Sequence, residues 1–371
     1  MIELKEICKV QCGFAFDSKK FTEDSSYYPL IRIRDVKRGF TQTYYTGEFS
    51  SEYIVHKGDL LVGMDGEFNI ARWNSDDALL NQRVCRIITN NNTNEEYLRF
   101  YLKRTLKLIE SKTSFVTVKY LSAKELNSLK LNLPCIEDQQ RISKQLSTLE
   151  LMIRKNKQVL ELLDELVKAR FVEMFGDVQD AKKRGGQQLK DICNTVAGGT
   201  PSTKHVEYYN GTIPWISTVS LGPNYIDGTT AKAFITQEAV DSSSTKIIPS
   251  GSILFGTRVG VGKSSINQVE MCTNQDIVAI IDLDVSKYNK LYIKYVLDTY
   301  QPYFDSIKKG ATILGISSDD LKNIYVPDAS LYEQNRFEKF VKQIDKSRSR
   351  IQKSLEASQE LFDSLMQEYF G

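Results

Sequence analysis

Residues 137–175 form one uninterrupted stretch with a single apolar stripe, and this stretch constrains the fold more than any other feature of the chain. Its apolar residues recur at steps of four, three, four, seven, three and four, at Ile142, Leu146, Leu149, Ile153, Leu160, Leu163 and Val167. This heptad spacing is typical of a helix that buries a narrow seam against a partner helix. Asn156 occupies the seam position that the step of seven skips, and a polar seam residue usually fixes the register. At about 1.5 Å per residue, the helix would be roughly 55–60 Å long and would need a partner.

The C-terminal residues provide that partner, because they repeat the same heptad frame at Phe337, Val341, Ile344, Ile351, Leu355, Phe362 and Leu365. Phe175-Gly176 aligns with Phe370-Gly371 at an offset of 195 residues, which persists outside the helices. Two unrelated surface helices are the alternative, and they would not share such an offset. We therefore predict an antiparallel coiled coil that pairs through Ile142, Leu146, Leu149, Ile153, Leu160, Leu163, Val341, Ile344, Ile351, Leu355 and Phe362.

The repeat covers most of the chain. Leu4-Lys5-Glu6-Ile7-Cys8 returns as Leu189-Lys190-Asp191-Ile192-Cys193, residues 57–63 return as 250–256, and Asn81-Gln82 returns as Asn274-Gln275. A period this long indicates a duplicated domain and not a solenoid. We predict two similar domains, 1–133 and 189–327, each followed by a long helix, 134–176 and 328–371, with a polar hinge at 177–188.

Each predicted domain mixes strand and helix signals. Short β-type apolar runs occur at residues 29–34, 59–62, 84–88, 213–218, 252–255 and 277–281. Helical patterns occur at residues 95–110 and 290–303. Such mixed runs predict an α+β fold in both copies.

Composition sets only mild limits on function. The formal net charge is +2, so nucleic-acid binding would depend on local patches of charge. The six cysteines contain no CxxC pair, and the two histidines lie far from any cysteine pair, so neither a zinc site nor a disulfide framework is indicated. No signal peptide and no run of membrane-spanning length is visible. These features are typical of a protein of the reducing cytoplasm.

Two loops have partial enzymatic signatures. Residues 257–264 resemble a phosphate-binding loop, but Thr257 replaces the required first glycine, and a turn and strand are expected where a helix should follow. Pro327-Asp328 could begin a nuclease metal site, but no acid-x-Lys strand is evident nearby, so a helix cap is the better interpretation. No methyltransferase cofactor loop is visible. We predict no catalytic and no metal-binding residues in this chain.

The chain resembles the specificity subunits of Type I restriction–modification systems over nearly its whole length. The segments that carry this resemblance are Gly13-Phe14-Ala15-Phe16-Asp17-Ser18, Met64-Asp65-Gly66-Glu67-Phe68, Leu80-Asn81-Gln82-Arg83-Val84, Gly198-Gly199-Thr200-Pro201-Ser202, Ile213-Pro214-Trp215-Ile216, Gly256-Thr257-Arg258-Val259-Gly260 and Thr273-Asn274-Gln275-Asp276-Ile277. The starts of the long helices, Gln139-Gln140-Arg141-Ile142 and Gln334-Asn335-Arg336-Phe337, are similar to the family's spacer regions. The second start has two more residues between its proline, Pro327, and Gln334 than lie between Pro134 and Gln139.

The resemblance implies a non-catalytic subunit with two target-recognition domains that read a bipartite sequence in double-stranded DNA. It also implies two modification (methyltransferase) subunits and restriction/translocase subunits as partners. S-adenosylmethionine, ATP and Mg would be used by those partners and not by this chain. Two similar domains on a rigid spacer would suit two half-sites at a fixed separation.

For DNA contact we expect cations and amides of the loops, with aromatic residues near them. The candidates are Lys19, Lys20, Arg32, Arg34, Arg72, Arg83, Lys204, Tyr208, Arg258, Lys263 and Lys309. Arginine can read guanine with two hydrogen bonds, whereas lysine mostly positions phosphate. Each cation, taken singly, could instead be a solvated surface charge, and Asn81-Gln82 and Asn274-Gln275 could be turn residues that serve only the fold.

Two other functions remain open from the residues alone. A duplicated coiled-coil adaptor would bind proteins and no DNA. A nuclease component with unrecognised catalytic residues would cut DNA in the presence of Mg. A steep salt dependence of DNA binding distinguishes the DNA reader from the adaptor.

Overall fold

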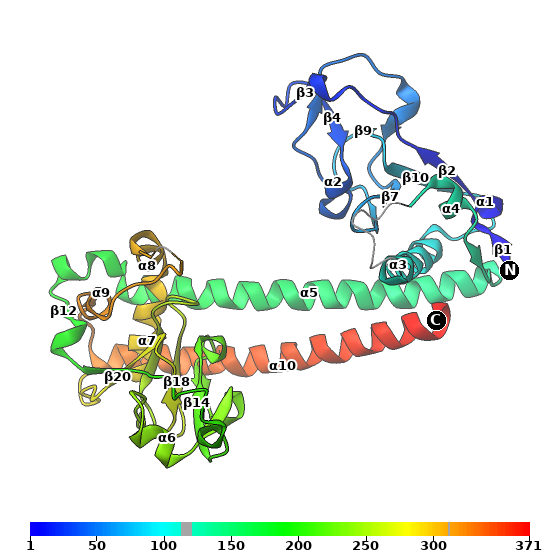
Figure 1. Ribbon diagram of the computed structural model, residues 1–371. Coiled ribbons are helices and arrows are strands. Elements are labelled where there is room, and N and C mark those ends of the chain that lie inside the picture. The colour runs from blue at the N-terminus through cyan, green and yellow to red at the C-terminus, as the bar shows by residue number, and fades with distance from the viewer. Residues whose placement is uncertain (113–120, 311) are drawn as a thin grey trace. The chain divides into compact units, whose positions relative to one another are not determined.

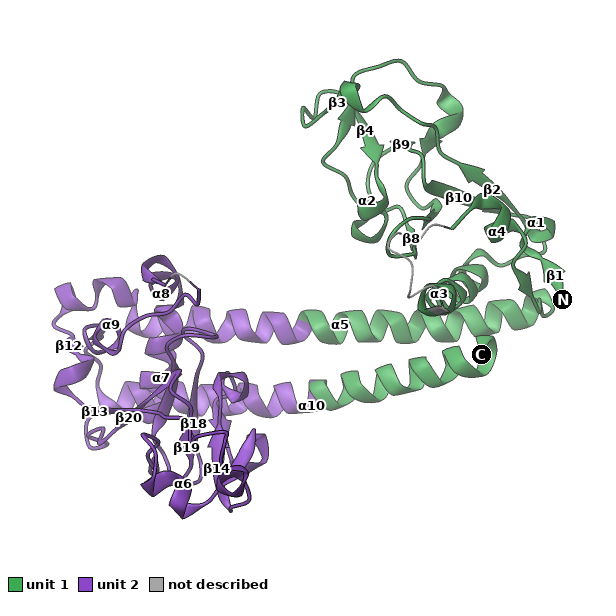
Figure 2. Ribbon diagram, in the orientation of Figure 1, with its two compact units in different colours: residues 1–158, 352–371 green, residues 159–351 purple. Residues whose placement is uncertain are grey.

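The computed structural model describes residues 1–112, 121–310 and 312–371 (Figure 1). The chain forms two compact units: unit 1 contains Met1–Gln158 and Gln352–Gly371, and unit 2 contains Val159–Ile351 (Figure 2). The chain passes from unit 1 to unit 2 inside the helix α5 (Ile136–Phe175), and it returns to unit 1 inside the helix α10 (Leu331–Phe370). Each unit therefore contains part of both long helices. The division into two domains, two spacer helices and a hinge at the predicted boundaries remains a prediction.

Unit 1 has two main sheets. The central sheet has the order β2-β10-β7-β8, the outer sheet has the order β3-β5-β4-β9-β6, and β1 pairs with β11. The elements are β1 Ile2–Glu3, α1 Leu4–Ile7, β2 Cys8–Cys12, η1 Ser18–Lys20, β3 Phe21–Thr22, β4 Tyr28–Ile31, α2 Ile33–Arg38, β5 Tyr44–Tyr45, η2 Ser51–Tyr53, β6 Ile54–Val55, β7 Leu60–Gly63, β8 Asn69–Arg72, β9 Ala78–Leu80, β10 Val84–Thr89, α3 Glu95–Lys112, α4 Ala123–Asn127 and β11 Lys130–Leu131.

Unit 2 has a central sheet of order β13-β20-β17-β18-β15, an outer sheet of order β16-β14-β19 and the pair β12-β21. Its elements are η3 Val178–Asp180, η4 Lys182–Arg184, β12 Gln187–Gln188, η5 Leu189–Asp191, β13 Asn194–Ala197, η6 Val206–Tyr209, β14 Ile213–Ile216, η7 Thr218–Ser220, β15 Tyr225–Ile226, η8 Gly228–Thr230, β16 Ala233–Ile235, α6 Gln237–Asp241, β17 Ile253–Gly256, β18 Ser264–Asn267, β19 Cys272–Thr273, β20 Ile277–Ile281, α7 Lys290–Thr299, α8 Gln301–Ile307, α9 Ser318–Lys322 and β21 Tyr325–Val326.

The two units repeat one topology, which confirms the predicted duplication and the α+β class. In both central sheets the hairpin β7-β8 or β17-β18 lies beside β10 or β20, which pairs in turn with β2 or β13. In both outer sheets one pair is parallel: β4 with β9, and β14 with β19. The segment predicted as a hinge forms η3, η4 and β12, and it buries Val178 and Ala181.

The middle strands of each central sheet, β7 and β10 in unit 1 and β17 and β20 in unit 2, are covered on both faces, which explains why they are mostly apolar without alternation. In unit 1, Leu60 and Ile87 pack with Leu98 of α3 on one face. On the other face, Leu61 and Val84 pack with the outer sheet and α2. Unit 2 repeats both layers with Ile253 and Ile280 on the α7 side and Leu254 and Ala279 on the other.

Three predicted elements are wrong in their extent, at residues 29–34, 213–218 and 290–303. The second of them, β14, ends at Ile216, and η7 begins at Thr218. The strand predicted at residues 29–34 ends at Ile31, because the Asp35 carboxylate accepts the Arg32 N–H at 2.9 Å and starts α2. The helix predicted at residues 290–303 is broken between α7 and α8, where Pro302 lies in the first turn of α8. Proline lacks the N–H that would continue the α7 hydrogen-bond ladder. The loop with a partial phosphate-binding signature is the β17-β18 hairpin, with a strand after it, as expected.

The long helices pair antiparallel within each unit, which confirms the predicted coiled coil. In unit 1, a cluster on α5 and α10 includes Ile142, Leu146, Ile153, Phe362 and Met366, with Leu149 and Leu355 packed at its edge. In unit 2, Val167, Phe171 and Phe175 pack with Phe337 and Val341, and Ile344 lies at the edge of that cluster. Leu160, Leu163 and Ile351 are half-buried and belong to neither cluster. Asn156 donates its side-chain N–H to Ser354 Oγ at 3.2 Å.

A buried glutamine anchors the start of each long helix in the same way. Gln139 Oε1 accepts the Asn94 N–H at 2.8 Å, and its Nε2 donates to the carbonyls of Asn92 and Pro134. Gln334 makes the equivalent bonds with Asn289, Lys287 and Ala329. Ala329 is therefore the counterpart of Pro134, and the apparent two-residue insertion after Pro327 does not exist. Pro327 instead corresponds to Asn132, because their carbonyls accept from Tyr292 and Tyr97.

We expect Gln139→Ala to lower the free energy of unfolding of unit 1 by roughly 2–4 kcal/mol, because it leaves buried backbone groups without partners. Gln139 is 1% exposed. The neighbouring Gln140 is exposed, so Gln140→Ala is a matched control with an expected change of less than about 0.5 kcal/mol. Urea unfolding followed by circular dichroism measures both variants. Equal stabilities would contradict the anchoring role.

Among the residues that the structure describes, no helix combines the length and the apolar character needed to cross a membrane.

Candidate nucleic-acid interface

In each unit, a glycine after the first strand of the central sheet packs against an Asn-Gln turn. Gly13 donates its N–H to Val84 O at 3.0 Å, and Gly198 donates to Ile277 O at the same distance. A Cβ on Gly13 would lie 2.2 Å from the Asn81 carbonyl oxygen, and one on Gly198 would lie 2.1 Å from that of Asn274. Glycine is therefore needed at both positions, and this close approach fixes two loops against each other at one end of the sheet.

The two residues of each Asn-Gln turn have different roles. Asn81 and Asn274 are buried, and Asn81 Oδ1 accepts the Gln82 N–H at 2.9 Å. Asn274 Nδ2 bonds to Asp276 Oδ2 at 3.2 Å. The asparagines therefore serve the fold, which agrees with the alternative that the Asn-Gln pairs are turn residues. The glutamine side chains are exposed; Gln275 bonds to the Thr200 hydroxyl.

A third loop joins the same end of each central sheet. It follows β7 in unit 1, where the Met64 N–H donates to Arg83 O at 2.9 Å. It follows β17 in unit 2, where the Thr257 N–H donates to Asp276 O at 2.8 Å. Each unit thus gathers three loops at one edge, and we call this the loop edge of the unit. The loop edge consists of residues 13–17, 64–67 and 81–83 in unit 1, and 198–202, 257–263 and 274–276 in unit 2.

Beside the loop edge of unit 1 lies an open groove of about 700 Å³. Its cations come from α2, where Arg34, Lys37 and Arg38 are exposed at helical spacing on one face. Arg32, at the start of α2, also lines the groove, and Asp65 and Glu67 line the opposite side. Lys37 pairs with Glu67 at 2.8 Å, and Arg83 pairs with Asp65. Arg83 lies in the Asn-Gln turn with φ of 68°.

The structure therefore brings Arg32, Arg34 and Arg83 together, but it separates the other candidates of unit 1. Arg72 pairs at 2.5 Å with Glu95 and Glu96 of α3. Burial lowers the pKa of Arg72, but the two carboxylates more than offset this effect, so its pKa is raised overall. This ion pair holds β8 to α3. Lys19 and Lys20 are exposed on η1, beside β3 of the outer sheet, and do not line the groove.

In unit 2, the structure brings Arg258 and Lys309 together. The Ile316 N–H donates to Thr257 O at 2.8 Å, and Gly315 packs directly against Arg258. Lys309 and Gly315 exchange two backbone hydrogen bonds and so close a hairpin beside the loop edge. Arg258 is 58% exposed, with Asp276 at 3.8 Å. Lys263 is exposed at the end of the same loop, where its side chain lies over Gly260.

Tyr208 and Lys204 lie apart from that cation cluster. Tyr208 is 9% exposed and packs with Trp215 and Ile235 in a small core. Its ring stacks on His205 with centroids 4.8 Å apart, so His205 and not Tyr208 presents a free ring surface to solvent. Lys204 is exposed in the preceding turn.

Several exposed residues of these surfaces are not among the candidates predicted from the sequence. Lys37 and Arg38 would have been found if residues 33–38 had been recognised as a helix, since they follow Arg34 at helical spacing. Ile313 and Leu314, both more than half exposed at the Lys309–Gly315 hairpin, stand between two glycines that mark a turn. The outward direction of Gln82 and Gln275 has no sequence signal.

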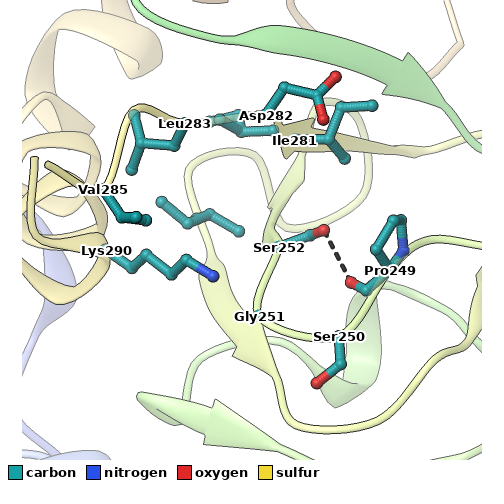
Figure 3. A pocket seen from close by; sticks show the side chains of 11 residues that line it. Pro249, Ser250, Gly251, Ser252, Ile281, Asp282, Leu283, Val285 and Lys290 are labelled. Atoms are coloured by element: carbon teal, nitrogen blue, oxygen red, sulfur yellow. Dashed lines mark hydrogen bonds between the residues drawn. The ribbon is translucent and has the colours of Figure 1, made fainter.

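A small pocket of about 160 Å³ lies at the opposite end of the unit 2 central sheet, where β17 starts and β20 ends (Figure 3). Figure 3 shows the Lys290 side chain extended toward Gly251, while the Asp282 carboxylate points away from Lys290. Asp282 accepts a hydrogen bond from Asn194. The equivalent place in unit 1 is filled by Arg72, which donates to Gly58 O at 2.7 Å. The pocket is thus separate from the loop edge.

The sequence profile described as "Type I restriction modification DNA specificity domain" matches residues 1–165 and 186–359. The chain is 40% identical over 168 residues to the Type I restriction enzyme EcoBI specificity subunit of Escherichia coli. It is 35% identical over 153 residues to the MjaIX specificity subunit of Methanocaldococcus jannaschii. These matches cover 45% and 40% of this chain but only 35% of each relative. The EcoR124I/EcoR124II specificity subunit of E. coli is 25% identical over 85% of this chain and 80% of its own length.

Two solved structures share the fold over the full chain. The S subunit of a Type I restriction–modification system from M. genitalium has a TM-score of 0.60 at 14% identity, with 95% of that chain covered. A chain from a structure described as the basis of complex assembly and conformational transition of the type I R-M system has a TM-score of 0.58 at 17% identity, with 96% covered. At these identities the likeness concerns the fold alone.

Proposed function

The chain belongs to the family of Type I restriction modification DNA specificity proteins, and we propose that it reads a bipartite sequence in double-stranded DNA. Each unit would read one half of the target through its loop edge. The observation that carries this proposal is the duplicated loop edge, with the same close glycine–asparagine contact and an exposed glutamine in both units. A pure adaptor has no need for two such edges flanked by cations.

The side chains at the loop edges suit base recognition. Arg83 and Arg258 can form two hydrogen bonds with guanine, and Gln82 and Gln275 can do the same with adenine. Lys37 and Lys309 are better suited to phosphate, because lysine acts as a point charge. The ion pairs of Arg83 with Asp65 and of Lys37 with Glu67 would be exchanged for DNA contacts on binding. We propose DNA contact for Arg32, Arg34, Lys204 and Lys263 as well, and Lys19 and Lys20 stay predictions. The ion pairs of Arg72 and the core contacts of Tyr208 favour a structural role for these two residues.

We further propose that the long helices hold the partner subunits. Within unit 2, the outer face of α5 exposes Val159, Leu162 and Leu166 at steps of three and four. An exposed, heptad-spaced apolar stripe is typical of a helix that binds further helices. The partners would be two modification subunits and the restriction/translocase subunits, in the cytoplasm. They would supply S-adenosylmethionine, ATP and Mg chemistry, and this chain would be non-catalytic.

The test of DNA reading is the salt dependence of duplex binding by the complex of this chain with its modification subunit. We expect affinity to fall steeply with salt, since neutralised phosphates release counterions. Arg258→Ala should weaken binding by about 10-fold or more and relax sequence preference at one position. Lys287→Ala is the matched control, because Lys287 is also an exposed cation but lies in the turn after β20, at the far end of the sheet. Equal losses in both variants would contradict a role for the loop edge.

A separate preparation of the chain alone tests the non-catalytic proposal. The purified chain without partners should transfer no label from S-adenosylmethionine to DNA and should leave a duplex intact in the presence of Mg. Methylation or cutting by the chain alone would overturn this part and leave the DNA-reading part standing.

A further inference from the structure

Two cysteines lie directly opposite each other in the central sheet of unit 1. Cys12 of β2 and Cys85 of β10 are paired in the antiparallel register, and their Sγ atoms are 2.8 Å apart. The next residue, Gly13, donates its N–H to Val84 O, so Cys12 and Cys85 occupy a non-hydrogen-bonded pair. In such a pair the Cα atoms are about 4.5 Å apart, which lies within the range found for disulfides. Little backbone movement would be needed to join the sulfurs.

The two thiols differ in access and in acidity. Cys12 is partly exposed, whereas Cys85 is fully buried, with its Sγ 3.4 Å from Met64 Sδ. The two sulfurs lie within hydrogen-bond distance of each other, and this contact lowers the pKa of Cys12 to about 7. The same contact raises the pKa of Cys85. At neutral pH a large part of Cys12 is therefore the nucleophilic thiolate, and a second thiol lies in contact with it.

The fold itself does not require these cysteines. The equivalent positions in unit 2 are Ala197 and Val278, which are paired in the same register of β13 and β20. One copy of the duplicated domain therefore has the sulfur pair, and the other has two ordinary apolar side chains. This comparison separates the pair from the needs of packing.

We propose that Cys12 and Cys85 are a reversible oxidation site, at which a hydroperoxide or a small-molecule disulfide joins them in a cross-strand disulfide. With hydrogen peroxide, the Cys12 thiolate attacks one oxygen and becomes a sulfenic acid as hydroxide leaves and takes up a proton to form water. Cys85 then attacks the Cys12 sulfur; the S–S bond forms, and the second oxygen leaves with the Cys85 proton as water. With oxidised glutathione, the Cys12 thiolate attacks one sulfur, the glutathione S–S bond breaks, and one glutathione leaves as its thiolate. Cys85 then attacks the Cys12 sulfur of the mixed disulfide, and the second glutathione leaves with the Cys85 proton as a thiol. In both routes the two cysteines are oxidised and the reagent is reduced.

The disulfide would link two residues 73 positions apart in sequence, next to the loop edge of unit 1. Closing so long a loop in the unfolded chain should raise the Tm of unit 1 by about 5–10 °C. The first loop-edge residue, Gly13, follows Cys12 directly, and Arg83 precedes β10 by one residue. We therefore also expect slower hydrogen exchange of the Gly13 and Val84 amides after oxidation.

The experiment uses the full chain with Cys135→Ser, because Cys135 is exposed and would otherwise react. After treatment with oxidised glutathione or hydrogen peroxide, we expect the mass to fall by about two units as the two thiol hydrogens leave. A linked Cys12–Cys85 peptide should appear, and dithiothreitol should reverse both changes and the rise in Tm. If both thiols remain open to alkylation in unfolded samples of the treated protein, the proposal is wrong.

The control variants are Cys12→Ala and Cys85→Val, which install the residues of unit 2 and should therefore fold. Both should abolish the linked peptide and the rise in Tm. In untreated protein, the rate of Cys12 alkylation should be half-maximal near pH 7, since the thiolate predominates above its pKa. Cys85→Val should move that midpoint up by more than one pH unit. An unmoved midpoint would overturn the role of Cys85. None of these readouts depends on the proposed DNA function.

Discussion

Replacing residues 1–133 with the equivalent domain of a relative that reads another sequence should change one half of the DNA target and leave the other half intact. The reason is that each unit carries its own loop edge with its own cations and glutamine. A wrong base pair costs about 1–3 kcal/mol, so a half-site changed at roughly three positions should alter preference by at least about 100-fold. Sequencing of methylated DNA from cells that carry the hybrid and its modification partner measures both halves.

The structure shows what the hybrid must preserve. α3 belongs to the replaced part, but Tyr97 and Phe100 pack on α5, and Asn94 donates to Gln139. The donor domain should therefore keep an asparagine and two aromatic residues at these positions. The reciprocal exchange of residues 189–327 is the control, and it should change only the other half. A change in both halves from either exchange would show that the units do not read independently.

The sequence predicts the architecture well because the features that carry it are periodic. The heptads of α5 and α10 follow from burial of one narrow stripe, and their residues reach the cores of both units. The duplication follows from a repeated order of segments, and even the hydrogen bonds of Gln139 return at Gln334. Helix ends marked by glycine are also predictable: α5 ends before Gly176, which has φ of 71°.

The candidate site is less predictable, because the role of a cation depends on its neighbours in space. Arg72 is bound by Glu95 and Glu96, which lie more than twenty positions away in sequence and reach it only after α3 packs on the sheet. Tyr208 is buried by Trp215 and Ile235, which pack with it only after the outer sheet of unit 2 has formed. Arg34 shares a face with Lys37 and Arg38 only because Asp35 starts a short helix. The first two outcomes depend on tertiary contacts, whereas the third depends on a short local helix signal.

Lengthening both long helices by four residues should widen the gap between the two halves of the target by about two base pairs. Four residues add about 6 Å of helix, and a base pair rises about 3.4 Å. Four residues also make a little more than one full helical turn, so the rotation of each unit about the helix axis would change little. Methylation of the parental target should fall at least about 10-fold.

The best insertion points are after Leu160 in α5 and after Ile351 in α10. Asn156 bonds to Ser354, and Arg348 pairs with Asp164, so insertion between these positions keeps both polar contacts within their own units. Leu160 and Ile351 lie outside both apolar clusters, so the cores remain whole. Four residues do not complete a heptad, so some seam contact and some stability should be lost.

A matched seven-residue insertion at the same two points restores the heptad and is the control for that loss of stability. It adds about 10.5 Å of helix, so it should widen the gap between the half-sites by about three base pairs. Seven residues fall about 20° short of two full helical turns, so the rotation about the helix axis is small. The measurement is the methylated motif in cells that carry each variant with its modification partner. If the paired helices set the separation, the gap should grow with the length of the insertion. Parental spacing at normal methylation levels in both variants would instead mean that residues outside α5 and α10 set the distance between the half-sites.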